Sequence, residues 1–262
     1  MKCDIITLFP EMVLPVLGQS MLKRAQEKGL LAVKVHNLRD YTQDRHRVAD
    51  DTPYGGGAGM VIKAEPVLRA IDSLREELTP SEPTMRILIS SPQGRPFTQQ
   101  MAEEFQRDSR RIVFICGHYE GFDERVRVGL NAEEVSIGDY VVTNGELPAL
   151  VMLDAAVRLI PGVLGDPDSA RQDSFVEGLL DCPHYTRPPE VRGMTVPDVL
   201  LSGNHEAIRR WRRKEALRST YVKRPELLQD RLLSQEDRRL LDEVLQETLK
   251  RPSVLCVEEE CL

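Results

Sequence analysis

Short apolar segments alternate with amphipathic helical segments over the first 160 residues of this chain. The apolar segments contain many β-branched residues, which is typical of buried strands. Helices between successive strands are the pattern of βαβ units, in which the strands run parallel and the helices cover the sheet. Strands are predicted over 2–8, 31–35, 85–90, 112–116 and within 134–145, and helices over 10–28 (interrupted near Pro15 and Gly18), 63–78, 98–107, 123–130 and 147–160.

Two of the predicted strands run into loops that contain glycines and acids. One loop, 117–121, follows the strand at 112–116, and the other lies within 134–145. Because the carboxyl ends of parallel strands meet at one edge of a sheet, these loops predict a ligand held between neighbouring strand ends. The alternative for the first loop is a tight strand–helix turn in which Glu120 and Asp123 only cap the next helix.

A long polar loop is predicted over 40–60, with four glycines between positions 55 and 59. The glycine spacing does not match a phosphate-binding loop or a dinucleotide fingerprint. An ordinary flexible loop is therefore one interpretation. The neighbouring Arg45, His46 and Tyr54 favour the other, a loop that meets an anion or a base.

The composition changes after position 162, and the sequence predicts two domains. Residues 1–163 form the α/β domain, a polar linker covers 164–176, a helical domain covers 177–250, and a short acidic tail covers 251–262. Within the second domain, 183–197 is rich in Pro and predicted to be extended. Helices are predicted over 197–201, 204–219 and 234–250, with Asn204 and Ser234 as N-caps.

Five basic residues surround the only Trp of the chain between positions 209 and 214. Basic side chains around a helical turn suit phosphate contacts, and an aromatic ring among them suits stacking on a base. The alternative is a solvated helix face paired with Glu206 and Glu215, with Trp211 in the core. The net charge of −7 argues against broad adhesion to nucleic acid, but it does not exclude a local basic patch.

The five cysteines form no Cys-x-x-Cys pair, which favours a reducing cytoplasm. No apolar run reaches the length of a membrane span, and no signal peptide is expected at the start. Cys182 and His184 could contact a metal, but structural zinc needs four ligands, so no metal site is predicted.

Two further polar residues have weak signals of their own. Arg158 lies on the apolar helix predicted at 147–160, where burial of a charge is costly without a partner, although a side chain near a helix end commonly reaches solvent. Asp173 lies in the polar linker, and its pattern alone does not distinguish it from a solvated loop acid.

A series of ordered motifs is more specific than any of these features. Over nearly its full length the chain resembles the bacterial tRNA (guanine-N1)-methyltransferase family of the knotted SPOUT class. The matching segments are Asp44-Arg-His-Arg, Asp51-x-Pro-Tyr-Gly-Gly-Gly-x-Gly-Met60, Ser91-Pro-Gln-Gly94, Cys116-Gly-x-Tyr-Glu-Gly121, Ser136-Ile-Gly-Asp-Tyr-Val141, Gly145-Glu-Leu-Pro-Ala149, Ile160-Pro-Gly-Val-Leu-Gly165, Asp173-Ser-Phe, Gly178-Leu-Leu-Asp-Cys-Pro-His-Tyr-Thr-Arg-Pro188, Leu200-Leu-Ser-Gly-Asn-His205 and Arg209-Arg-Trp-Arg212.

The resemblance implies an α/β parallel sheet with a deep trefoil knot, a small C-terminal α-helical domain, and S-adenosylmethionine bound among the knot loops. It also implies a homodimer whose active site lies at the subunit interface, with Asp173 reaching the partner's cofactor. Implied cofactor contacts are Ser91, Pro92, Gly117, Tyr119, Glu120, Ile137, Gly138, Asp139, Tyr140, Val141, Val142 and Gly145. Expected tRNA contacts are Arg45, His46, Tyr54, Asn204, Arg209, Arg210, Arg212 and Arg213.

The implied reaction is methylation of N1 of the guanine immediately 3′ of the anticodon, position 37. Guanine N1 carries a proton at neutral pH, so a base must remove it, and the resemblance assigns this role to Asp173. Arg158 matches the family's Arg that stabilises charge on guanine O6. Whether Mg²⁺ assists proton removal is left open. Two positions depart from the family pattern: Asn144 replaces a glycine, and His118 stands where many relatives have Arg.

Two other functions compete with this one. The chain could be a related SPOUT enzyme that methylates a different RNA position, or a tRNA-binding protein without catalysis. Mapping any methyl group that the purified chain transfers to tRNA separates the three.

Overall fold

A computed structural model describes residues 1–165, 173–229 and 231–250 of the chain. The chain divides into two compact units, Met1–Ala170 and Arg171–Leu262. We call them the first unit and the second unit and describe each by itself. Part of the predicted linker and the whole predicted tail, 251–262, lie outside the described residues.

The first unit contains a parallel five-stranded sheet in the order β2-β1-β6-β5-β7. Neighbouring strands in this order pair in parallel throughout. This confirms the parallel sheet inferred from the alternation of strands and helices. The strands are β1 (Lys2–Thr7), β2 (Ala32–Asn37), β5 (Arg86–Pro96), β6 (Ile112–Ile115) and β7 (Glu133–Ser136).

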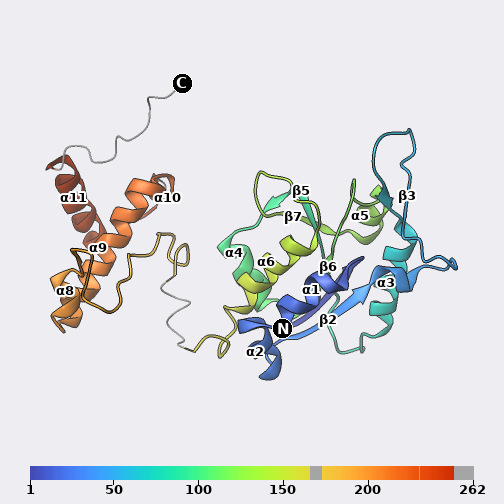
Figure 1. Ribbon diagram of the computed structural model, residues 1–262, viewed down its shortest axis with the longest axis horizontal. Helices are drawn as coiled ribbons and strands as arrows, with labels where there is room; N and C mark the ends of the chain where they lie inside the picture. Colours follow the sequence, from blue (N-terminus) through green and yellow to red (C-terminus); the bar gives the residue numbers. More distant parts are fainter. Residues whose placement is uncertain (166–172, 230, 251–262) are drawn as a thin grey trace. The chain divides into compact units, whose positions relative to one another are not determined.

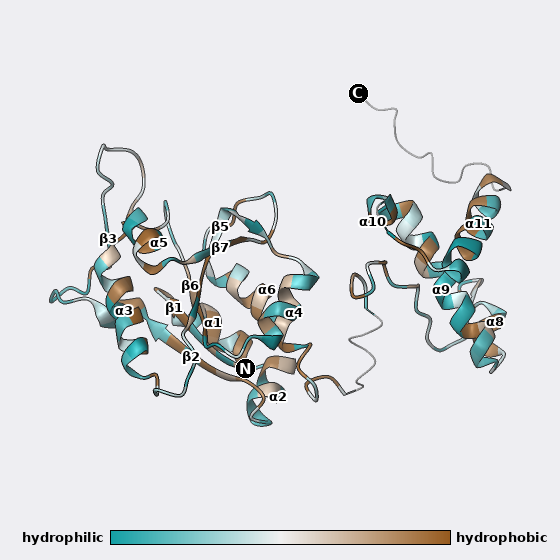
Figure 2. Cartoon of the chain, turned by 180° about the vertical axis from the view of Figure 1, so that it is seen from behind, coloured by the Kyte–Doolittle hydropathy of each residue, from teal (hydrophilic) through white to brown (hydrophobic). Residues whose placement is uncertain are grey.

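Helices cover both faces of the sheet, and each face has its own core (Figure 1). Successive residues of a strand point to opposite faces, so Ile5 joins one core and Ile6 the other. One core packs against α1 (Pro10–Leu17), α2 (Ser20–Glu27), α4 (Gln99–Arg107) and α6 (Glu146–Val157). The other packs against α3 (Ala64–Glu76) and α5 (Glu124–Leu130). In Figure 2 the central strands are coloured as hydrophobic, as burial on both faces requires.

Residues 91–94 leave the sheet in the middle of β5. Ser90 and Arg95 both pair with Val135 of β7, so the four residues between them form a protruding loop. The strand then continues to Pro96, beyond the predicted end at residue 90. This excursion has no counterpart in the hydrophobic pattern, because it depends on which strand β5 meets.

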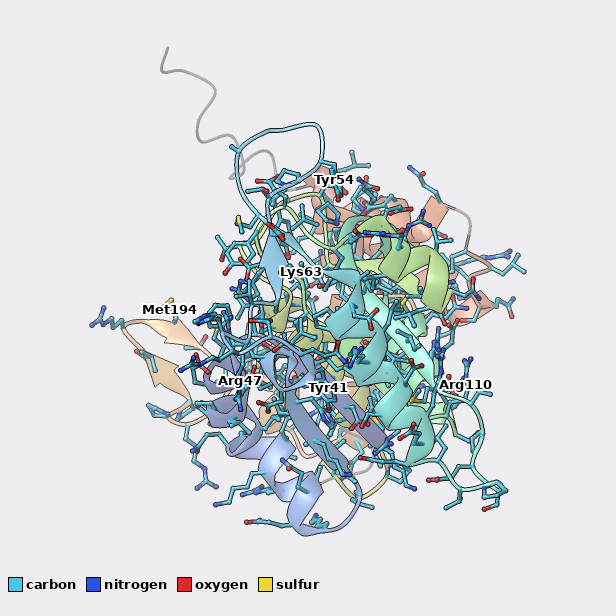
Figure 3. All side chains as sticks on the ribbon, turned by 90° about the vertical axis from the view of Figure 1, so that its right-hand side faces the viewer. Tyr41, Arg47, Tyr54, Lys63, Arg110 and Met194 are labelled. Atoms are coloured by element: carbon cyan, nitrogen blue, oxygen red, sulfur yellow. The ribbon has the colours of Figure 1, made fainter. Side chains whose placement is uncertain are left out.

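The predicted long loop between residues 40 and 60 contains short elements that the sequence did not indicate. A 3-10 helix, η1 (Leu38–Tyr41), begins it, and β3 (Asp50–Asp51) pairs antiparallel with β4 (Val61–Ile62). Between β3 and β4 the chain projects from the sheet, with Tyr54 on the projection (Figure 3).

The second unit is mainly helical. Its helices are α8 (Asp198–Leu201), α9 (His205–Lys223), α10 (Glu226–Gln229) and α11 (Gln235–Lys250). The side chain of Asn204 accepts a hydrogen bond from the Ala207 N–H, which confirms it as the N-cap of α9. Leu217 of α9 and Leu240 of α11 are buried together with Leu179.

Some local predictions were wrong. Pro15 does not interrupt α1, which continues to Leu17 and ends at Gly18. The Pro-rich segment is not simply extended, because β8 (Glu190–Val191) and β9 (Met194–Thr195) form a hairpin there. Its turn at Arg192 and Gly193 has positive φ angles at both positions, the conformation of a tight hairpin turn. Among the described residues, no helix combines the length and the apolarity needed to cross a membrane.

Candidate functional site

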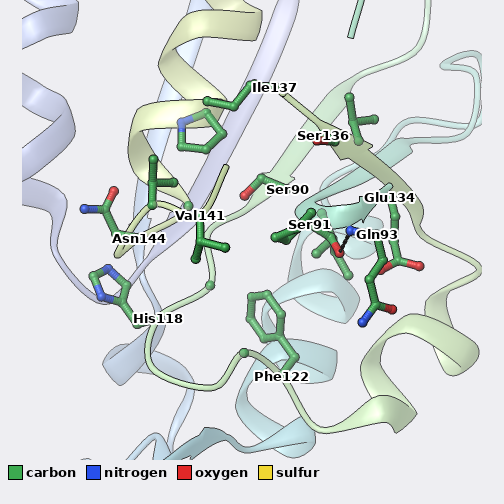
Figure 4. Close-up of a pocket in the computed structure, with 18 of the residues that line it drawn as sticks. Ser90, Ser91, Gln93, His118, Phe122, Glu134, Ser136, Ile137, Val141 and Asn144 are labelled. Atoms are coloured by element: carbon green, nitrogen blue, oxygen red, sulfur yellow. Dashed lines mark hydrogen bonds between the residues drawn. The ribbon is translucent and has the colours of Figure 1, made fainter. Parts of the chain in front are cut away.

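A cavity of about 410 Å³ lies at the carboxyl ends of β5, β6 and β7. Three loops build it. They are residues 90–93 at the start of the excursion in β5, the segment 117–124 after β6, and the segment 136–145 after β7. Figure 4 shows Ser91, His118 and Val141 from these three loops around the same space. The cavity therefore lies where the two glycine-bearing loops predicted a ligand.

The structure brings nearly all of the predicted cofactor residues together. Asp139 is the exception, because it is exposed and does not line the cavity. The predicted residues that do line it are Ser91, Pro92, Gly117, Tyr119, Glu120, Ile137, Gly138, Tyr140, Val141, Val142 and Gly145.

Two glycines allow the three loops to approach so closely. A Cβ atom on Gly145 would lie 2.6 Å from the Gly117 nitrogen, and one on Gly94 would lie 2.4 Å from the Glu134 carbonyl carbon. These atoms are backbone and cannot move aside. The Gly145 N–H also donates to the Gly117 carbonyl at 2.8 Å, which ties the last loop to the second. Glycine is required at both positions for steric reasons.

The loop after β6 is held by backbone hydrogen bonds to the end of the glycine-rich loop. The Glu120 N–H donates to the Met60 carbonyl at 3.0 Å, and the Ile62 N–H donates to the Gly121 carbonyl at 2.9 Å. Tyr119 adopts a φ of 59°, a left-handed conformation that is uncommon for an aromatic residue. Such strain persists only where neighbouring contacts impose it, and it is frequent at binding sites.

A buried carboxylate supports this wall of the cavity. Glu146, at the start of α6, is 0% exposed and accepts a hydrogen bond from the Thr7 hydroxyl. Its Oε2 also lies 2.9 Å from Nε2 of His118, whose ring is 4.6 Å from that of Phe9. Glu146 was not among the functional residues predicted from the sequence. The available signal was an acid at the start of an otherwise apolar helix, where burial requires polar partners.

Acidic side chains predominate around the opening. Glu120, Asp123, Glu124 and Glu134 line the cavity, with Arg127 as the arginine among its lining residues. The side chain of Arg125 donates hydrogen bonds to Asp123 and lowers the pKa of that carboxyl to about 2. Asp123 also caps α5, as the alternative interpretation of this turn required. Ser90 and Phe122 also line the cavity and were not indicated by the sequence, whereas Gln93, Glu134 and Thr143 lie within predicted loops or motifs but were not named as contacts.

The two predicted catalytic residues lie elsewhere in the chain. Arg158 is the C-cap of α6, whose N-terminus borders the cavity. A helix of 12 residues is about 18 Å long, so Arg158 stands at the far end from the cavity of its own chain. Asp173 belongs to the second unit, where the Val176 N–H donates to its carbonyl and the Ser174 hydroxyl accepts from the Asp181 N–H.

The predicted tRNA residues fall into two groups. Arg45 and His46 are exposed in the segment between η1 and β3, and Tyr54 is fully exposed on the projection between β3 and β4. The others belong to α9 or cap it. There Arg209 pairs with Glu236, Arg210 with Glu243, and Arg213 with Asp237 and Glu177, whereas Arg212 forms no ion pair within the described part of the chain.

These pairs differ from the ones that the sequence suggested. Glu206 is not their partner, and the acids come mainly from α11, which lies against α9. Trp211 is half-buried rather than in the core.

Asp181, Cys182 and His184 place potential metal-ligand atoms within 4.8 Å of one another. Of these three residues, only Cys182 and His184 were candidates from the sequence. Burial, and then the Asp181 carboxylate, raises the pKa of Cys182 to about 11, which disfavours the thiolate that a metal needs. His184 Nε2 is already hydrogen-bonded to Asp181 at 2.8 Å. Three ligands also fall short of the four of a structural zinc site.

The fold and the cavity together define an α/β protein that binds a ligand at the carboxyl edge of a parallel sheet. Comparison with known proteins adds the family. Residues 1–230 match the family described as tRNA (Guanine-1)-methyltransferase TrmD. The chain belongs to this family.

Individual relatives agree with this result. A tRNA (guanine-N(1)-)-methyltransferase of Dictyoglomus turgidum is 53% identical over 247 residues, which cover 94% of this chain and 98% of that protein. A protein of the same name from Dehalococcoides mccartyi is 53% identical with the same coverage. One from Bacillus cereus is 52% identical over 94% of this chain and its own full length.

Proposed function

We propose that this chain transfers a methyl group from S-adenosylmethionine to N1 of guanine 37 in tRNA, the base immediately 3′ of the anticodon. The observation that carries the proposal is the cavity itself. The family motifs at 91–94, 116–121 and 136–145 are far apart in the sequence, and they converge on one ligand-sized space. Full-length similarity to relatives named for this reaction supports the same conclusion.

The residues around the cavity fit S-adenosylmethionine. This cofactor carries a sulfonium and an ammonium group, and acidic side chains such as Glu120 and Glu134 complement those charges. A phosphate-bearing ligand would meet repulsion at the same rim. The close backbone contact at Gly145 brings the loops after β6 and β7 together at one side of the cavity. Bound there, S-adenosylmethionine supplies an electrophilic methyl group.

In the proposed reaction Asp173 accepts the N1 proton of guanine. Arg158 stabilises the negative charge that then develops toward O6. The methyl group would move to N1 by direct displacement, in which the bond from methyl to the sulfonium breaks and the neutral thioether leaves. The chain therefore mainly has to align donor and acceptor, and no covalent enzyme intermediate forms. We assign no step to Mg²⁺, because the cavity carboxylates do not form a ligand cluster among the residues described.

We propose further that the chain acts as a homodimer with the active site at the subunit interface. Arg158 lies about 18 Å along α6 from the cavity of its own chain, so a second copy has to supply the Arg158 that acts there. An exposed apolar surface supports a dimer. Leu14 and Val16 of α1 are 54% and 45% exposed, and Leu147 and Val151 of the contacting helix α6 are 48% and 49% exposed.

Three finer features belong to the same proposal. The loops around the cavity form a deep trefoil knot, and the enzyme works in the cytoplasm. Residues 1–163 bind the cofactor, 164–176 link the domains, and 177–250 form a helical domain that binds tRNA. Two close backbone contacts support a knotted path, because each brings distant segments of the chain into contact. In one, residues 91–94 pass against β7, and in the other Gly145 lies against Gly117.

Methyl transfer to an unmodified tRNA transcript tests the proposal. The purified chain is incubated with methyl-labelled S-adenosylmethionine and the transcript, and the labelled nucleoside is identified and mapped. We expect 1-methylguanosine at position 37 and no label in a transcript that carries adenine there. Label at another position would indicate a different RNA methyltransferase, and binding without transfer would indicate a tRNA-binding protein.

A further inference from the structure

A second cavity, of about 580 Å³, lies entirely within the second unit. It is bounded by residues 183–189 on one side and by α8 and α9 on the other. Leu200 and Ile208 contribute apolar surface to it, and Tyr185, Trp211 and Arg212 line the same space. Family motifs supply several of its lining residues, and Arg212 is an expected tRNA contact, but the proposed reaction assigns no ligand to the cavity itself.

Two aromatic rings stand together in it. The ring centroids of Tyr185 and Trp211 are 6.3 Å apart and their planes are inclined by 56°. Tyr185 is 48% exposed, and Trp211 is half-buried. Unpaired nucleobases stack on aromatic rings whose faces are open to solvent.

The charges around the cavity have one sign. Arg187 and Arg212 line it, and no Asp or Glu does. Neither arginine takes part in an ion pair among the residues for which contacts are described. This differs from the rest of α9, where Arg209, Arg210 and Arg213 are paired with acids. In a chain with a net charge of −7, uncompensated arginines beside open aromatic rings suit an anionic ligand with a planar ring.

We propose that this cavity, which we call the aromatic pocket, binds one unpaired nucleobase of an RNA. The base stacks on the face of one ring and meets the other at its edge, because the planes of Tyr185 and Trp211 are inclined by 56°. Arg187 and Arg212 contact the adjoining phosphates. An apolar peptide would not use the two arginines, and a free anion would not use the rings. The proposal rests on the proposed function in that the RNA is the tRNA substrate, and it assigns the unpaired base to the second unit.

Trp211 is the only Trp of the chain, so its fluorescence reports on the aromatic pocket directly. Titration of the full chain with unmodified tRNA transcript should quench this emission saturably, because a stacked base quenches an indole. A blunt RNA duplex, which has phosphates but no unpaired base, serves as the control and should leave the emission unchanged. Binding of both RNAs is followed independently by filter retention.

Two substitutions with matched controls test the contacts. Tyr185→Leu and Arg212→Gln should each weaken tRNA binding about tenfold, as expected when one stacking or phosphate contact is lost. Tyr221→Leu and Arg238→Gln remove the same groups from exposed positions outside the aromatic pocket, and should change the dissociation constant less than twofold. S-adenosylmethionine affinity, measured by calorimetry, should be the same in all four.

The outcomes separate this inference from the proposed function. If tRNA binds and is methylated, but Trp211 emission is constant and Tyr185→Leu binds normally, the aromatic pocket does not hold a base while the methyltransferase remains. If an unpaired RNA quenches Trp211 and no methyl group is transferred, the aromatic pocket stands and the proposed reaction fails. Equal quenching by the blunt duplex would also overturn the base-binding role.

Discussion

Glu146 shows how a single buried group can shape a site that it does not touch. Its side chain is sealed between Thr7 and His118, and His118 in turn lines the cavity. A carboxylate without solvent is tolerated only because both partners hydrogen-bond to it. His118, one of the two departures from the family pattern, is thus held in place by Glu146 and by its contact with Phe9.

Replacing Glu146 by Ala should destabilise the first unit by about 3 kcal/mol, because it leaves the buried Thr7 hydroxyl and His118 without their acceptor. Urea unfolding followed by circular dichroism measures the loss. Cofactor affinity should fall as well, since the wall that carries His118 is released. Glu76→Ala, at an exposed position on α3, should leave both quantities unchanged. An equally stable Glu146→Ala variant would contradict this role.

Asp173→Ala tests the proposed base. Loss of a general base lowers turnover by about 10²–10⁴-fold. S-adenosylmethionine affinity should stay nearly constant, because the proposed role of Asp173 is to accept the guanine proton and not to hold the cofactor. Single-turnover methyl transfer and calorimetry measure the two effects separately. Near-normal turnover in this variant would make the assignment wrong.

At the scale of elements, the cavity depends on segments that pass one another at minimal distance. Gly94 faces the backbone of β7, and its Cβ position is 2.4 Å from the nitrogen of Val135. Gly94→Ala should therefore cost about 3 kcal/mol through overpacking and reduce cofactor binding. Gly165 has no atom within 4 Å of its Cβ position, so Gly165→Ala should be neutral. Chemical denaturation of both variants makes the comparison, and equal stability would refute the steric argument.

The contact between α9 and α11 depends on acids that stay ionised. Hydrogen bonds from Lys214 and Arg218 lower the pKa of Glu247 to about 2, and Arg213 lowers the pKa of Asp237. A carboxyl group whose pKa is lower in the folded protein than in the unfolded chain stabilises the fold at pH values above its unfolded pKa, near 4. This contribution disappears as the pH falls toward the pKa of the folded state.

The urea midpoint of the second unit, followed by Trp211 emission, should therefore fall between pH 5 and pH 2. Glu247→Gln should reduce the change in unfolding free energy over this pH range by only about 0.5 kcal/mol, because the side chain is half exposed and solvent screens its ion pairs. Asp242→Asn, at an exposed position of α11 outside the ion pairs, is the matched control. A midpoint that does not change with pH would show that the pairs contribute nothing.

The whole molecule is expected to work as a pair of chains. Leu14→Asp and Val151→Asp place charges on the exposed apolar surface of α1 and α6, where a dimer would bury them. Light scattering should then report half the mass of the wild type, and methyl transfer should be lost. Val128→Asp on α5, where the side chain is 65% exposed, should keep the dimer. A wild-type chain of monomer mass would refute the shared site.

The sequence by itself determined the parallel sheet and the loops that line the cavity. Those features are local: strand and helix periodicities are present within each segment, and glycines mark the turns at 117–121 and 138–145. The N-caps Asn204 and Asp123 were readable for the same reason, because a cap acts on residues two or three positions away.

Only the tertiary structure decided the burial of Glu146, the excursion at 91–94, the pairing of α9 with α11, and the aromatic pocket. Each depends on which distant segments meet. Arg210 and Glu243 are 33 residues apart, and Thr7 and Glu146 are 139 apart, so no periodicity links them. Whether an arginine is paired with an acid is fixed by its neighbours across the fold. On α9, Arg209 pairs with Glu236, whereas Arg212 forms no ion pair among the described residues.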